Sequence, residues 1–153
     1  MGNSLDFTVL KKISETEIPF ELTVAGLSMN PFLLEGDLIS CKKQEEYYPG
    51  DILVFFYNNE LIVHRLLKIK GKLLYCKGDN SFLLEHVKAE TVLGKVLLVF
   101  RKGTKIDLPI INKEFIRLSY QISKEFRMCG YDKQTILNTP VYICFKRRYL
   151  DTR

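Results

Sequence analysis

Two residues of this sequence could together cleave an amide bond. Ser28 lies in the segment G-L-S-M-N-P at 26–31, and His64 follows 36 residues later within V-H-R. A serine hydroxyl is a weak nucleophile at neutral pH and needs a neighbouring group to take its proton. Imidazole suits that task, because its ordinary pKa lies close to neutral pH. If the fold brings the two side chains together, Ser28 is a candidate nucleophile and His64 its candidate base.

The segments around both residues have the pattern of short β-strands. Residues 18–24 alternate in polarity and are rich in β-forming types, so a strand is predicted there. Ser28 falls just after it, where Gly26 and Pro31 interrupt the backbone, and Asn58-Asn59 predicts a tight hairpin. Further strands are predicted at 37–41, 52–57, 61–69, 73–76 and 91–101. His64 lies in the strand predicted at 61–69.

The hydrophobic period changes near residue 112 and indicates a helix. Apolar residues then recur every three or four positions, with Asn112 as a plausible N-cap and Gly130 as a stop. A second short helix is predicted at 133–137. The fold class expected is mainly β with a C-terminal helical appendage. Its parts are an N-terminal extension at 1–17, a β-rich domain at 18–101 and a helical, basic appendage at 102–153.

The positive charge is concentrated in the C-terminal third. The chain has a net charge of +5, yet residues 101–153 alone carry 12 basic and 5 acidic groups. One interpretation is a solvated basic surface. The other is contact with an acidic peptide, a membrane or an export-machinery partner. Nucleic-acid binding is not expected, because no nucleic-acid motif accompanies the charge.

The remaining composition limits the cofactors and the compartment. The four cysteines form no C-x-x-C pair, so no metal and no cofactor are expected. No apolar run approaches the roughly 20 residues of a transmembrane helix. The N-terminus also lacks the features of a signal peptide. A cytoplasmic protein, or one peripheral to the membrane, is therefore expected.

Five short motifs occur in an order that resembles a known family. They are G-L-S-M-N-P-F-L-L-E-G-D, Y-P-G-D-I-L-V-F, V-H-R-L-L-K-I, K-G-D-N and L-G-K-V, within residues 22–100. This order resembles type I signal peptidases and their relatives in the S24/S26 superfamily. The resemblance implies the β-fold shared by signal peptidases and LexA-like proteins. The histidine at position 64 makes the third motif similar to that of the serine–histidine branch of the family, which is found in the endoplasmic reticulum and in spore formers.

The resemblance also implies roles for individual residues. Ser28 would be the nucleophile and His64 the general base. Asp79, in K-G-D-N, matches the aspartate of the family's last motif, where it would either orient His64 or cap a turn. Glu85 stands near the position of the acid that orients the histidine in this branch. Backbone N–H groups around Ser28 would hold the oxyanion, and the substrate would contact four residues near the nucleophile: Gly26, Leu27, Met29 and Pro31.

The main function expected is a serine endopeptidase that removes a leader or signal-like segment from a peptide or protein precursor. One alternative is a LexA-like self-cleaving regulator. Against it, the base in those proteins is lysine, and a DNA-binding domain precedes their serine, whereas 27 residues precede Ser28 here. The other alternative is a non-catalytic peptide-binding module on the same fold.

Overall fold

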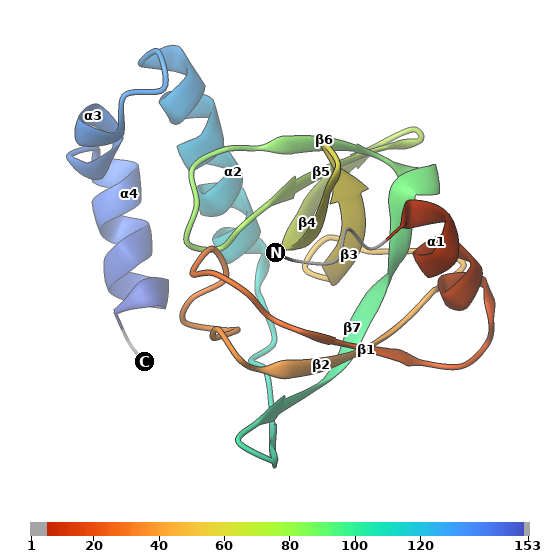
Figure 1. Ribbon diagram of the computed structural model, residues 1–153. Helices are drawn as coiled ribbons and strands as arrows, with labels where there is room; N and C mark the ends of the chain where they lie inside the picture. Colours follow the sequence, from red (N-terminus) through yellow and green to blue (C-terminus); the bar gives the residue numbers. More distant parts are fainter. Residues whose placement is uncertain (1–5, 152–153) are drawn as a thin grey trace.

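The computed structural model describes residues 6–151, in which eight strands form one antiparallel sheet with the order β1-β2-β7-β3-β4-β5-β6 and β8 beside β7. The long strand β7 joins the β1–β2 half of the sheet to the β3–β6 half (Figure 1). The mainly β prediction is confirmed. The strands are β1 (Phe20–Thr23), β2 (Leu38–Lys42), β3 (Ile52–Tyr57), β4 (Glu60–Lys70), β5 (Leu73–Lys77), β6 (Glu85–Lys88), β7 (Val92–Arg101) and β8 (Thr104–Ile106).

The β3–β4 hairpin illustrates how local sequence builds this sheet. Asn58 and Asn59 both adopt positive φ, at 50° and 62°, as a two-residue turn of this kind requires. The turn sets the register in which Leu53 pairs with His64. Strand β3 is hydrogen-bonded to β4 and to β7, and its first four residues are buried. A continuous apolar run is therefore the pattern expected of this central strand.

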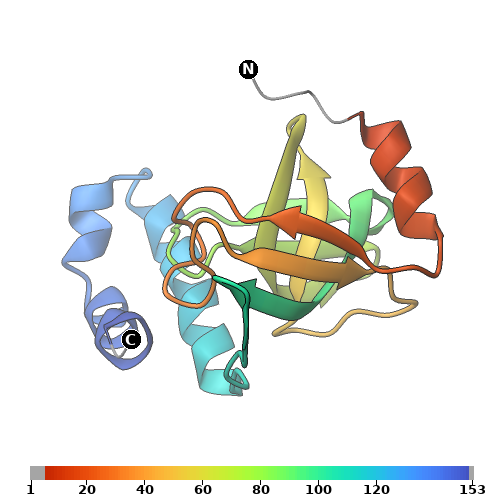
Figure 2. The same ribbon diagram turned by 60° about the horizontal axis from the view of Figure 1, so that its bottom comes forward.

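A helix that the sequence patterns did not reveal precedes the sheet. Residues 1–17 were expected to be an extension, but α1 (Phe7–Glu15) begins at Asp6, whose carboxylate accepts a hydrogen bond from Thr8 N. The ring of Phe7 packs edge-on against Phe56 of β3 at 4.9 Å, and Leu10 joins the core cluster. Figure 2 shows α1 on the opposite side of the sheet from the C-terminal helices. Its amphipathic face is short, which explains why it was missed.

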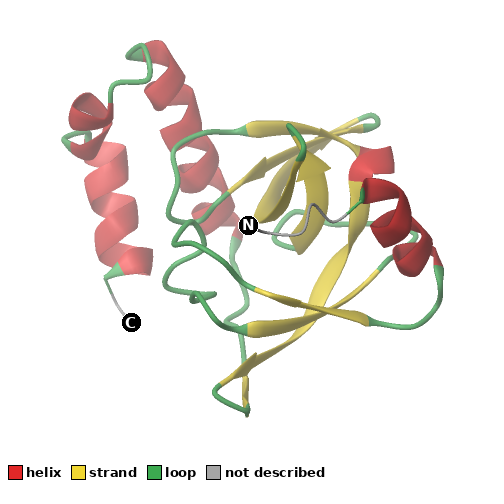
Figure 3. Cartoon of the chain, in the orientation of Figure 1, coloured by secondary structure: helices red, strands yellow, loops and turns green. Residues whose placement is uncertain are grey.

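The C-terminal segment is helical, as predicted. It contains α2 (Lys113–Met128), α3 (Lys133–Leu137), α4 (Pro140–Phe145) and a π-helical turn, η2 (Lys146–Leu150), grouped on one side of the sheet (Figure 3). Asn112 caps α2 by accepting from Phe115 N at 2.8 Å. The predicted apolar face of α2 is buried, and it forms one cluster with α4 and with Phe32 of the β domain. Its α2 members are Phe115, Leu118, Ile122 and Phe126.

Three short elements depart from the expected boundaries. Strand β6 has four residues and β8 has three, and a 3-10 turn, η1 (Ala89–Thr91), separates β6 from β7. Because β8 pairs with β7, the sheet continues past residue 101, where the β domain was expected to end. Segments of this length are too short to show a period. Among the described residues, no helix is long and apolar enough to cross a membrane.

A partly buried ion pair links the end of β7 to Asp37, which lies directly before β2. Arg101 donates to both carboxylate oxygens of Asp37 at 2.8 Å, and Leu34 N donates to Asp37 at 2.8 Å. The hydrogen bonds from Arg101 lower the pKa of Asp37, against the opposing effect of burial. A carboxyl whose pKa is lower in the folded state stabilises the fold above its unfolded pKa of about 3.9. That stabilisation disappears as the pH falls through the folded value.

We therefore expect Asp37→Asn to lower the free energy of unfolding more at pH 7 than at pH 3, because the stabilisation begins to decline once the pH falls below the unfolded pKa of about 3.9. Urea titrations of wild type and variant at both pH values measure the difference. Asp107→Asn, at an exposed carboxylate, is the matched control and should change little at either pH. An equal loss from Asp37→Asn at both pH values would contradict the ionic account.

Candidate active site

The structure brings Ser28, His64 and Glu85 into one line of hydrogen bonds. Ser28 Oγ lies 3.0 Å from His64 Nε2, and His64 Nδ1 lies 2.8 Å from Glu85 Oε1. A carboxylate can only accept, so this network assigns the proton to Nδ1 and leaves the Nε2 lone pair facing the Ser28 hydroxyl. That tautomer is the one a general base requires.

Strand register explains why His64 and Glu85 meet. His64 and Leu66 are two residues apart on β4 and so share a face of the sheet. Leu66 pairs with Cys76 of β5, and Cys76 pairs with Glu85 of β6. His64 and Glu85 therefore emerge on the same face, two strands apart. The line of hydrogen bonds depends on this register, which one-residue slippage would destroy.

The site is largely shielded from water. His64 and Glu85 are each 7% exposed, and the ring of Phe55 lies edge-on to the imidazole at 6.4 Å. The second Glu85 oxygen, Oε2, is buried and has no hydrogen-bond partner within residues 6–151. A carboxylate in direct contact with an imidazole stabilises a positive charge on the ring by electrostatic attraction. Glu85 is thus placed to stabilise an imidazolium at His64.

The loop after β5 forms the other wall of the site. Asn80 N donates to Ser28 O at 2.8 Å, and Asn80 Nδ2 donates to Leu27 O at 3.2 Å. A Cβ at Gly78 would lie 2.7 Å from Ser28 O and 2.9 Å from His64 Nε2. Only glycine fits that position without displacing the two candidate catalytic groups. Gly78 belongs to the motif K-G-D-N, but no sequence pattern predicted this role for it.

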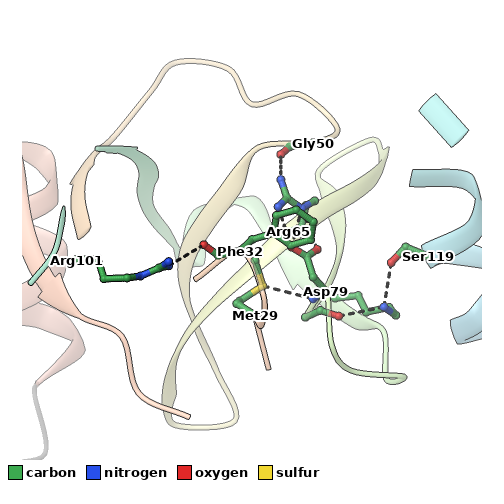
Figure 4. A network of polar contacts seen from close by, with 9 residues as sticks. Met29, Phe32, Gly50, Arg65, Asp79, Arg101 and Ser119 are labelled. Carbon is green, nitrogen blue, oxygen red and sulfur yellow. Dashed lines mark hydrogen bonds and ion pairs between the residues drawn. The ribbon is translucent and has the colours of Figure 1, made fainter. Parts of the chain in front are cut away.

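The carboxylate of Asp79 contacts Arg65 and not His64. Arg65 Nε donates to Asp79 Oδ1 at 2.9 Å and Arg65 Nη2 donates to Asp79 Oδ2 at 2.7 Å, while Arg65 Nη1 donates to Gly50 O at 2.7 Å (Figure 4). The carboxylate on His64 belongs to Glu85. Of the two roles expected for Asp79, orienting His64 or a structural one, these contacts favour the structural role. Asp79 instead anchors the loop that supports Ser28.

Removing one partner of this pair should destabilise the fold strongly. The Arg65 and Asp79 side chains are 4% and 0% exposed, so Asp79→Asn would leave a buried guanidinium without its counter-charge. We expect a loss of about 3–5 kcal/mol in the free energy of unfolding, measured by urea denaturation. Glu114→Gln, which breaks the exposed pair with Arg148, is the control and should cost below about 1 kcal/mol. Similar losses from both variants would contradict the account.

A pocket of about 380 Å³ adjoins the candidate dyad. Strand β1 and the segment after it form one wall, and β4 forms the other. Among the described strands, β1 pairs with β2 alone, so its other edge is open. The lining is mostly apolar and consists of Leu22, Thr23, Val24, Ala25, Ser28, Met29, Leu61, Ile62, Val63 and His64.

The predicted substrate contacts agree only in part with this pocket. Met29 lines it, although its side chain is almost fully buried in the core. Gly26, Leu27 and Pro31 are not among its lining residues. The chain turns sharply at the nucleophile, where Asn30 N donates to Leu27 O, and this turn leaves Gly26, Leu27 and Pro31 outside the lining. Residues of β1 and β4, which no sequence pattern indicated as substrate contacts, supply the walls instead.

Comparison with known proteins assigns this chain to a family. The model of the Peptidase S24-like family matches residues 5–97, and the chain belongs to that family. It is similar to LexA repressors from Pelotomaculum thermopropionicum and Desulforamulus reducens, at 35% and 36% identity over 85 residues. These alignments cover 54% of this chain and 41% and 39% of the two relatives. A LexA repressor from Desulfitobacterium hafniense is 33% identical over 92 residues, 58% of this chain and 44% of that protein.

These relationships confirm the superfamily and the β-fold that the motifs implied. The chain spans about two fifths of the length of the curated relatives it matches. Those relatives are repressors, whereas the finer expectation was a signal peptidase of the serine–histidine branch. The comparisons support the LexA-like alternative better than that finer assignment.

Proposed function

We propose that the protein is a serine endopeptidase in which Ser28 is the nucleophile, His64 the general base and Glu85 the residue that orients the histidine. The observation that carries the proposal is the continuous line of hydrogen bonds from Ser28 Oγ through the imidazole to Glu85. Membership of the Peptidase S24-like family supports the same chemistry.

The reaction would proceed by acyl transfer. Ser28 Oγ attacks the scissile carbonyl carbon as its proton passes to His64 Nε2, and the resulting imidazolium is stabilised by Glu85. When the tetrahedral intermediate collapses, the C–N bond breaks and Nε2–H protonates the leaving amine. His64 then takes a proton from water, whose oxygen attacks the acyl carbon. As the second tetrahedral intermediate collapses, the C–Oγ bond breaks and His64 Nε2–H returns the proton to Ser28 Oγ. Backbone N–H groups near Ser28 would stabilise the oxyanion, a contribution usually worth ~10²–10³ in rate for each donor.

The open edge of β1 suits an extended peptide. A substrate segment there could add main-chain hydrogen bonds to the sheet and place alternate side chains in the apolar pocket. We propose that the substrate is a leader or signal-like segment of a peptide or protein precursor. A contact of the basic C-terminus with a membrane or an export-machinery partner remains a prediction. Two of its cations are already paired, Lys146 with Asp151 and Arg148 with Glu114.

A LexA-like self-cleaving regulator is the second candidate, favoured by the identity of the curated relatives. The residue that contacts Ser28 as general base distinguishes the self-cleaving regulator from the endopeptidase proposed above. In self-cleaving repressors the base is expected to be lysine, whereas the group bonded to Ser28 Oγ here is His64. Intact-mass measurement of wild type and Ser28→Ala over time separates the candidates. Loss of a fragment from wild type alone would favour self-cleavage.

Cleavage of a pooled peptide library, followed by mass spectrometry, tests the proposed function. Wild type should cleave a subset of peptides with a common apolar preference, and Ser28→Ala should cleave none. The cleaved set would also define which side chains the pocket accepts. Peptide binding without cleavage by either protein would favour the non-catalytic module.

A further inference from the structure

A lysine that the proposed mechanism does not use lies fully buried next to the candidate site. Lys77 is 0% exposed, at the end of β5 and directly before Gly78. Its ammonium donates to Gly78 O at 3.0 Å and to Ser119 Oγ of α2 at 2.9 Å, and it lies 5.7 Å from the ring centre of Phe145 on α4. In Figure 4, Ser119 reaches from α2 toward the loop that contains Asp79. One buried cation thus connects two C-terminal helices to the loop after β5 that begins with Gly78 (the Gly78 loop).

The carbonyl that Lys77 holds belongs to Gly78, whose Cα lies close to both residues of the candidate dyad. A side chain at Gly78 would collide with Ser28 O and His64 Nε2, so no Cβ can be accommodated there. Its carbonyl also accepts from Ser81 N at 3.0 Å, and Asn80 N, two residues after Gly78, donates to Ser28 O. A shift of this loop would therefore move the backbone of the nucleophile and crowd the imidazole.

A second contact connects the helices to the same loop. The guanidinium of Arg65, which holds Asp79, lies 5.4 Å from the ring centres of both Phe32 and Phe115, which pack edge-on against each other. Phe115 belongs to α2, so the helix touches both cations that hold the loop. The C-terminal helices begin at residue 113 and therefore lie outside the region 5–97 that the family model matches. Burial lowers the pKa of Lys77 to about 8, while Asp79 and Glu85 act in the opposite direction.

We propose that Lys77 is a positioning residue through which helix α2 holds the Gly78 loop against Ser28 and His64. The C-terminal helices are then part of the catalytic apparatus rather than a separate appendage. This inference rests on the proposed function for its catalytic consequence, but its structural consequence can be measured independently.

The test uses three variants of the full chain. Lys77→Met removes the ammonium and keeps the length and apolar stem of the side chain. Ser119→Val and Ser119→Thr fill similar volumes, and only threonine retains a hydroxyl for Lys77. Hydrogen exchange is followed at Asn80 N–H and Ser81 N–H, with Ala89 N–H, bonded to Lys72 O at the far end of β5, as an internal reference. Reaction of Ser28 with a fluorophosphonate is measured in parallel.

Lys77→Met and Ser119→Val should each speed exchange at Asn80 and Ser81 by roughly tenfold relative to Ala89. They should also slow the maximal rate of fluorophosphonate reaction by roughly tenfold, with half-saturation unchanged, because geometry and not affinity is lost. Ser119→Thr should behave like wild type in both assays. Wild-type exchange at the two loop amides in both Lys77→Met and Ser119→Val would overturn the inference.

The two assays separate this inference from the proposed function. If wild type does not react with the probe but loop exchange rises as expected, Lys77 positions the loop and the peptidase proposal fails. If wild type reacts and the variants react at the same maximal rate, the peptidase proposal stands and the positioning role is contradicted.

Discussion

His64→Ala is expected to slow the reaction of Ser28 with peptide or fluorophosphonate by roughly 10²–10⁴-fold, the usual contribution of a general base. Ser28 Oγ bonds to His64 Nε2, so its proton would have no acceptor in the variant. The β3–β4 hydrogen bonds stay in place, but the buried Glu85 carboxylate loses its partner, so the free energy of unfolding should also fall and rates are compared for the folded protein. Progress curves for probe labelling give the rates, and urea denaturation reports stability.

The second histidine provides a matched control. His86 follows Glu85 on β6, but its side chain is exposed and packs edge-on against the ring of Tyr75 at 4.9 Å. His86→Ala should therefore keep the wild-type labelling rate. If His64→Ala and His86→Ala labelled Ser28 equally fast, the assignment of His64 as base would be wrong.

Gly78→Ala is expected to abolish most activity without altering any group that takes part in the chemistry. The added methyl would lie 2.7 Å from Ser28 O and 2.9 Å from His64 Nε2, distances that real Cβ contacts do not tolerate. The nucleophile and base must separate to relieve the clash, and misplacement of about 1 Å can cost ~10² in rate. Probe labelling of the folded protein measures this loss.

Gly94→Ala distinguishes a local effect from a general loss of folding. Gly94 is similarly crowded, because its Cβ would lie 2.8 Å from the backbone of Lys42 where β7 crosses β2. We expect Gly94→Ala to lower the free energy of unfolding but to keep the labelling rate of the folded fraction. The explanation fails if Gly78→Ala labels at the wild-type rate, or if both variants lose rate only in proportion to unfolding.

Long, regular segments could be predicted from the sequence. Residues 52–57 and 133–137 were predicted with the bounds that β3 and α3 show, and Asn112 was correctly identified as the cap of α2. The elements that were missed have other reasons for forming. Strand β6 contains Glu85 and His86, which are weak β signals, and forms because it pairs with β5.

The site followed from the order of motifs rather than from any single spacing. Ser28 and His64 were predicted from residue chemistry and family resemblance, and the structure places them in contact. The choice between Asp79 and Glu85 needed the register of β4, β5 and β6, which sequence does not encode locally. Gly78 and Lys77 act through contacts 14 to 50 residues away in the chain, and no pattern indicates such contacts in advance.

The most direct test of the central claim is the location of the fluorophosphonate adduct by tandem mass spectrometry. Cleavage after lysine gives the peptide 13–42, which contains three serines: Ser14, Ser28 and Ser40. If Ser28 is the activated nucleophile, the adduct will be on Ser28 alone, and Ser14 and Ser40 will report background reactivity. Labelling spread over all three, or no adduct under conditions where a known serine peptidase is labelled, would contradict the account.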